Sequence, residues 1–104
     1  MKNKYCKTVQ YPCHDQVAMQ HFVEAFKKTV LKSYVEDGNM ISYCLSCNDQ
    51  DSTVQLFSVW KDKETKDNAV LAVNDEMRLQ IRPFMREKYS FVQGEVVLAD
   101  GVDI

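Results

Sequence analysis

A chain of 104 residues and 12.1 kDa is long enough for one hydrophobic core and too short for two, so we expect a single domain over residues 1–104. Thirteen basic and fifteen acidic side chains give a formal charge of −2, which argues against a nucleic-acid partner because such proteins need surplus Lys and Arg to neutralise phosphates. Apolar residues make up 45% of the chain, so a largely disordered protein is also excluded.

The sequence offers no segment that would take it into or across a membrane. No apolar run approaches the roughly 20 residues that span a bilayer, and residues 1–7 lack the apolar stretch of a signal peptide. We therefore expect a cytoplasmic protein with no membrane partner. In that reducing compartment the four cysteines are expected to be free thiols, at Cys6, Cys13, Cys44 and Cys47.

The first predicted element is a strand over residues 4–11. Its side chains alternate, with Tyr5, Val9 and Tyr11 on one face and smaller or polar residues on the other. Pro12 lacks a backbone N–H and ends the strand.

A helix is expected next. Asp15 can cap it by accepting a hydrogen bond from the first free backbone N–H groups. Apolar residues then recur every three or four positions for about five turns. Gly38 can take the left-handed conformation that closes a helix, so one amphipathic helix should end near Val35. Its apolar stripe consists of Ala18, Phe22, Ala25, Phe26, Thr29 and Val30.

Residues 40–47 and 53–60 predict an antiparallel hairpin, because both segments alternate and residues 48–52 have turn chemistry throughout. The second of these strands is apolar on both faces and must therefore be covered twice. On the first strand Ile41, Tyr43, Leu45 and Cys47 should face one way and Met40, Ser42, Cys44 and Ser46 the other. On the second, Val54, Leu56 and Trp60 should oppose Phe57 and Val59.

A second helical region follows the polar residues 61–67, with apolar residues at helical spacing up to Phe84. Asn74 offers a cap for a restart and Pro83 limits continuation, so we expect a short helix followed by a longer one. Residues 88–98 supply the fourth strand.

The order strand, helix, strand, strand, helix, strand predicts an α+β fold of the ferredoxin-like split βαβ type (βαββαβ), with two helical regions on one face of a four-stranded antiparallel sheet. The opposite face would then be bare although the third strand is apolar on both sides. A second copy of the same sheet is the simplest cover for such a face, so we expect a homodimer through the helix-free face.

Two segments of this pattern resemble a known family. Residues 38–45 read Gly-Asn-Met-Ile-Ser-Tyr-Cys-Leu, and residues 56–64 read Leu-Phe-Ser-Val-Trp-Lys-Asp-Lys-Glu. A Gly before a strand that contains Tyr43, and a strand that ends in Trp60 before a charged helix start, is similar to the antibiotic biosynthesis monooxygenase domain of the dimeric α/β-barrel superfamily. The element order agrees over nearly the whole chain.

The resemblance implies a dimeric α/β barrel whose sheets pack face to face, with a small-molecule pocket between sheet and helices in each subunit. Members of the family include cofactor-independent oxygenases of aromatic polyketides, haem-degrading enzymes and proteins that process quorum signals. The implied function is a monooxygenase without metal or flavin cofactor, acting on a small aromatic or enolisable metabolite.

Three positions depart from the family pattern. Where many members carry an acidic residue two positions before the Trp, this chain has Ser58, and where the oxygenases often carry an Asn four positions before it, this chain has Leu56. Residues 69–70 are Ala-Val where the haem-degrading branch has its His ligand. Haem ligation by the family route is therefore not expected, and only Trp60 and Tyr43 carry over.

The chemistry of a cofactor-free oxygenase suggests three catalytic candidates. Triplet oxygen reacts slowly with closed-shell molecules, so the protein must deprotonate its substrate, stabilise the anion and exclude water. His14, where the first strand meets the helix, is a candidate base because imidazole titrates near neutrality, and a solvated loop His is the alternative. Trp60 is a candidate to hold an anionic oxygen or stack on a flat substrate, against a purely structural role. Tyr43 is a candidate hydrogen-bond donor, against cross-strand packing.

The sequence also bears on three alternative functions. Cys44 and Cys47 lie three apart on a strand and should point to opposite faces, so no metal site is expected. A non-catalytic dimeric binding module for a hydrophobic small molecule remains the competing hypothesis. An RNA-recognition module of the same topology is excluded because residues 54–60 lack its basic, Gly-containing pattern.

Overall fold

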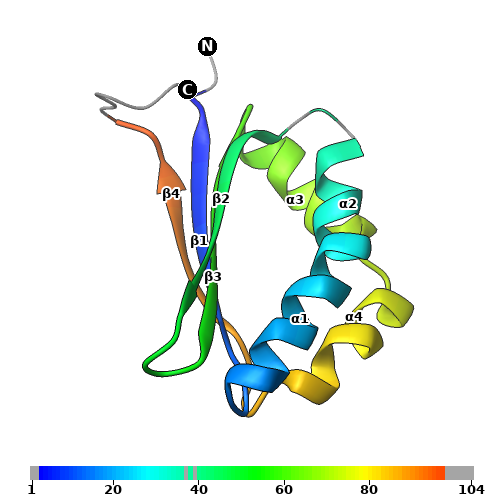
Figure 1. Cartoon of the computed structure of the whole chain (residues 1–104). Coiled ribbons are helices and arrows are strands. Elements are labelled where there is room, and N and C mark those ends of the chain that lie inside the picture. Colours follow the sequence, from blue (N-terminus) through cyan, green and yellow to red (C-terminus); the bar gives the residue numbers. More distant parts are fainter. Residues whose placement is uncertain (1–2, 37, 39, 98–104) are drawn as a thin grey trace.

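The computed structural model describes residues 3–36, 38 and 40–97, which form a four-stranded sheet with helices packed on one face (Figure 1). The strands are antiparallel and lie in the order β2-β3-β1-β4, so the predicted α+β ferredoxin-like arrangement is confirmed. The strands are β1 (Tyr5–Pro12), β2 (Met40–Asn48), β3 (Thr53–Trp60) and β4 (Ser90–Glu95). The helices are α1 (Gln16–Lys28), α2 (Val30–Glu36), α3 (Lys63–Ala72) and α4 (Asp75–Ile81), followed by a 3₁₀ turn, η1 (Arg82–Phe84).

The core lies between the sheet and the helices and is built by the alternation of β1 and β3. Tyr5, Val9 and Tyr11 of β1 are buried on the helix side, as their spacing predicts. Their partners on β3 are the equally buried Trp60, Leu56 and Val54. Lys7 and its partner Ser58 occupy the remaining positions of the same face, so the strand period places a lysine on the core side of the sheet.

The first helical segment consists of two helices where one was expected. Asp15 caps α1 as predicted, its carboxylate accepting a hydrogen bond from the Ala18 N–H at 2.8 Å. The helix then breaks at Thr29, whose hydroxyl donates to the Ala25 carbonyl at 2.8 Å. A hydroxyl that bonds the carbonyl one turn back competes with the helix ladder, which accounts for the break. Gly38 has a φ of +69°, as expected for a residue that closes a helix.

The second helical region is divided at Asn74 as predicted. The longer helix comes first, however, because α3 has ten residues and α4 has seven, whereas a short helix followed by a longer one was expected. The polar start is helical because Asp62 and Thr65 form a reciprocal capping box. Pro83 lies in η1 and prevents α4 from continuing as an α-helix. Strand β4 is shorter than expected at both ends, and Leu98 of the prediction lies outside the described residues.

The helix-free face of the sheet carries no charged side chain at any of its fifteen described, strand-paired positions. A bulge between Met40 and Ser42 reverses the alternation at the start of β2, so Met40 joins the helix side and packs on the core, contrary to expectation. The helix-free positions are Cys6, Thr8, Gln10, Pro12, Ser42, Cys44, Ser46, Asn48, Thr53, Gln55, Phe57, Val59, Ser90, Val92 and Gly94. Within the described part of the chain, none of the helices combines the length and apolarity needed to cross a membrane.

Candidate functional site

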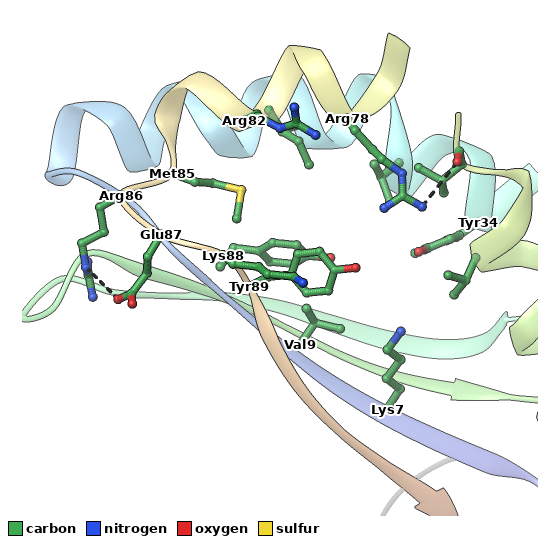
Figure 2. Close-up of a pocket in the computed structure, with 15 residues that line it drawn as sticks. Lys7, Val9, Tyr34, Arg78, Arg82, Met85, Arg86, Glu87, Lys88 and Tyr89 are labelled. Carbon is green, nitrogen blue, oxygen red and sulfur yellow. Dashed lines mark hydrogen bonds and ion pairs between the residues drawn. The ribbon is translucent and has the colours of Figure 1, made fainter. Parts of the chain in front are cut away.

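A cavity of about 650 Å³ lies between the sheet and the helices, and Figure 2 shows its wall. This volume is typical of pockets that bind small molecules. Strand β1 forms one side, helices α2, α3 and α4 form the other, and the segment between η1 and β4 completes the lining. The lining residues are Lys7, Val9, Tyr11, Val30, Tyr34, Val70, Val73, Arg78, Ile81, Arg82, Met85, Arg86, Glu87, Lys88 and Tyr89.

Three phenols line this cavity. The rings of Tyr11 and Tyr89 lie with their centroids 5.7 Å apart. Burial raises the pKa of Tyr34 to about 12, and burial, with Tyr34 and Tyr89 nearby, raises the pKa of Tyr11 further. Tyr11 and Tyr34 therefore stay protonated at neutral pH and can each donate a hydrogen bond to a bound oxygen atom.

Lys7 enters the cavity from the sheet. Its Nζ lies 4.5 Å from the centre of the Phe91 ring, and its side chain points toward the space between Tyr34 and Tyr89 (Figure 2). Partial burial lowers the pKa of Lys7, and the like charges of Lys66 and Arg78 lower it further. A lysine in this setting holds its proton less tightly than an exposed lysine.

The cavity wall is strongly basic in a chain whose net charge is −2. Five of the lining residues are cationic and one is anionic. The anionic residue, Glu87, forms an ion pair with Arg86, with 3.5 Å between Nε and Oε1, and Arg86 also donates hydrogen bonds to the carbonyl oxygens of Cys13 and Asp51, both at 2.7 Å. Arg86 is thus engaged in the fold. The other four cations are Lys7, Arg78, Arg82 and Lys88, and the described residues supply none of them with an ion pair.

Trp60, the first catalytic candidate, lies behind this cavity and not in its wall. Its side chain is 1% exposed, and its indole Nε1–H donates to Ser58 Oγ at 2.9 Å. The edge-on contact between Trp60 and Tyr34, with ring centroids 5.2 Å apart, links it to the lining. In this arrangement Trp60 can act on a ligand only through Tyr34.

The other two candidates lie elsewhere. His14 is exposed at the junction of β1 and α1 and does not line the cavity. Tyr43 is 48% exposed and lines a second, shallower hollow between β2 and the first two helices, together with Leu31 and Leu45. The structure therefore does not bring Trp60, His14 and Tyr43 together.

The cysteines take the positions that the strand period requires. Cys47 pairs with Val54 on the helix side and Cys44 with Phe57 on the opposite side. All four cysteines are free thiols, as expected. The described residues contain no cluster of three or more His, Cys, Asp or Glu side chains with metal-binding proximity.

Solved structures share this architecture. A dimeric ferredoxin-like protein from an uncultured marine organism has a TM-score of 0.79 at 11% identity, over 98% of this chain and 95% of its own. A candidate antibiotic biosynthesis monooxygenase from Nitrosomonas europaea has a TM-score of 0.77 at 14% identity, over 97% of both chains. SnoaB, a cofactor-independent oxygenase from Streptomyces nogalater, has a TM-score of 0.70 at 15% identity, over 94% of this chain and 99% of its own.

The chain has the fold of the antibiotic biosynthesis monooxygenases. The resemblance seen in residues 38–45 and 56–64 is thus confirmed at the level of the fold. No protein-family model and no curated protein sequence matches the chain. Because these likenesses are all at 15% identity or below, the chemistry must be argued from the cavity itself.

Sequence reasoning missed the polar groups of this cavity. A signal was present in Lys7, because a lysine between Tyr5 and Val9 sits on a strand face that is otherwise buried. A second signal was the four-residue spacing of Arg78 and Arg82, which places two cations on one side of a helix. Neither signal shows by itself that Lys7 and the two arginines face one another across the cavity.

Proposed function

We propose that the protein is a cofactor-independent monooxygenase that acts, as a homodimer, on a small aromatic or enolisable metabolite in the cytoplasm. The observation that carries this proposal is the cavity, in which phenols and cations from opposite sides converge among apolar side chains. Such a cavity excludes water from a flat substrate and favours its anion. The likeness of the fold to a cofactor-independent oxygenase supports the same reaction class.

The proposed reaction converts an activated CH₂ group and O₂ into a C=O group and water. A base removes one proton, and the resulting carbanion gives one electron to O₂. The radical and superoxide combine to a peroxide, which takes up a proton and then eliminates water. One oxygen atom ends in the product and the other in water, and the substrate supplies all four electrons.

Two groups of the cavity fit these tasks. Lys7, whose pKa is lowered by burial, is proposed as the base that removes the proton, acting in the fraction of molecules in which its amine is neutral. The hydroxyl of Tyr34 is proposed to stabilise the oxygen on which the anion develops. Lys7 takes the place of the exposed His14 in this scheme because it lines the cavity.

The homodimer is proposed through the helix-free face of the sheet. That face combines Phe57 and Val92 with small and uncharged polar residues, and it lacks charge in a chain of which 27% is charged. Val92 is 72% exposed in the single chain, and a second sheet packed on this face would cover it. A dimeric protein is among the structures with this fold.

A non-catalytic dimeric binding module for a hydrophobic small molecule is the second candidate. It is favoured by the buried Leu56 and Ser58, which stand where the family's Asn and acidic residue are expected. It is also favoured by Trp60, whose N–H is already bonded within the fold. The two candidates share the cavity and differ only in whether oxygen is consumed.

Oxygen uptake separates the candidates. The chelator-treated protein is mixed with anthrone, an enolisable tricyclic ketone, and dissolved oxygen is followed with an electrode. An oxygenase should consume one O₂ per anthrone at a rate proportional to protein, and Lys7→Met should abolish the excess rate. Lys28→Met, which removes the same charge from the exposed surface of α1, should not. A rate equal to that without protein would leave only the binding module.

A further inference from the structure

Two arginines on the α4 side of the cavity, Arg78 and Arg82, have no task in the proposed reaction. Arg78 lies within α4 and Arg82 directly follows it, so the two are four residues apart. Both line the cavity. Like charges at this spacing repel each other, so an interaction with a negative group would stabilise both arginines.

The fold does not provide that interaction within its described residues. No ion pair there involves Arg78 or Arg82. Arg78 donates one long hydrogen bond, at 3.5 Å, from Nη2 to the Val73 carbonyl, which leaves other N–H groups of its guanidinium available. Glu87, the carboxylate of the lining, is held by Arg86.

The cations also face one another across the cavity. Figure 2 shows Arg78 extending from α4 toward the sheet and Lys7 extending from the sheet toward α4, with Tyr34 and Tyr89 between them. Since the like charges of Arg78 and Lys7 repel, a negative group bound near Arg78 would relieve the repulsion as well as satisfy the guanidinium.

We propose that Arg78 and Arg82 bind a carboxylate carried by the substrate, so that the ligand of this cavity is an aromatic or enolisable carboxylic acid. A guanidinium matches a carboxylate in shape and makes two parallel charge-assisted hydrogen bonds with it. This inference rests on the proposed function for the identity of the site and adds the substrate class and its orientation.

The orientation follows from the two sides of the cavity. A carboxylate held at α4 places the other end of a flat molecule toward β1, where Lys7 stands. Tyr34 and Tyr89 lie along the length of such a molecule. The carboxylate therefore remains unchanged in the reaction, and the carbon that loses a proton lies at the end opposite to it.

Binding of a matched pair of probes tests the proposal without relying on turnover. Calorimetric titration should show 2-naphthoate binding at least about tenfold more tightly than the neutral isostere 2-naphthamide, as a charge-assisted pair of hydrogen bonds supplies. Arg78→Met should reduce this preference to less than about twofold, Arg82→Met should reduce it partly, and Arg78→Lys should retain part of it. Lys28→Met is the control for long-range charge and should keep the full preference.

The outcomes distinguish this inference from the proposed function. Equal binding of acid and amide, no binding of the acid at millimolar concentration, or an unchanged preference in Arg78→Met would overturn the carboxylate site. A preference that depends on Arg78, in a protein that consumes no oxygen, would support the carboxylate site and leave the monooxygenase proposal contradicted. A circular dichroism melt of each variant separates lost binding from lost folding.

Discussion

Ser58 Oγ accepts a 2.9 Å hydrogen bond from Trp60 Nε1 and donates a 3.1 Å bond to the Lys7 carbonyl, so one hydroxyl ties the buried indole to the neighbouring strand. Ser58→Ala would leave the buried indole N–H without an acceptor and lower the free energy of unfolding by about 1–3 kcal/mol. Urea denaturation measures this loss. Ser33→Ala, in helix α2 and away from the helix-free face, should not lower the free energy of unfolding, and an equal loss in the two variants would contradict the role assigned to Ser58.

Tyr34 should make the protein sensitive to alkali. Its folded pKa is raised to about 12 by burial, above the ordinary value of 10.0, so the folded state holds the proton more tightly than the unfolded state. The resulting stabilisation is complete below pH 10 and is lost as the pH rises toward 12. Tyr34→Phe removes this dependence, so the loss of unfolding free energy across that window should be smaller than in the wild type. Urea denaturation at pH 9 and 11 measures the unfolding free energy of both proteins. An equal loss between these pH values in the wild type and in Tyr34→Phe would refute the prediction.

Lys7 should cost stability. Its ammonium is partly buried and is repelled by Lys66 and Arg78, and Asp67 is the one nearby carboxylate with an opposing effect among the described residues. Because the pKa of Lys7 is lowered, the unfolded state binds more protons, and the cost declines only as the pH rises from the folded pKa toward 10.5. Lys7→Met should raise the unfolding free energy at pH 7 by about 1 kcal/mol. A decrease would show that the ammonium is well compensated.

The helix-free face should determine the oligomeric state. Val92→Lys places a charge on that face and should convert the dimer to a monomer, because a buried unpaired charge costs several kcal/mol. Light scattering coupled to size exclusion should then give the chain mass in place of about twice that value. Leu71→Lys, at an 81% exposed position of α3, is the matched control and should remain dimeric. A wild-type monomer at micromolar concentration would contradict the dimer itself.

The sequence was sufficient for the architecture because strand alternation and helix caps are local signals. Asp15 and Asn74 cap helices as predicted, and the buried face of β1 follows from its period of two. The break at Thr29 was missed because a threonine hydroxyl has a choice of partners that spacing does not reveal. The bulge at Met40 was missed because one extra residue leaves no mark on composition.

The site was less predictable than the fold because it depends on which side chains meet across the core. Trp60 was a candidate to bind a ligand through its indole N–H, but that N–H donates to Ser58 within the fold. His14 was favoured for its intrinsic titration range, yet it lies outside the cavity. Lys7 and Arg78 come from elements about seventy residues apart, and only the packing of α4 over β1 brings them to one cavity.

Isotope labelling of the product tests the central claim most directly. The chelator-treated protein is incubated with anthrone under ¹⁸O₂, and the protein-dependent product is analysed promptly by mass spectrometry. The account predicts a ketone that carries one ¹⁸O atom, about 2 Da heavier than the product formed under ¹⁶O₂, and its disappearance in Lys7→Met. A product without the label, or equal product with and without protein, would contradict the assignment of this cavity as an oxygenase site.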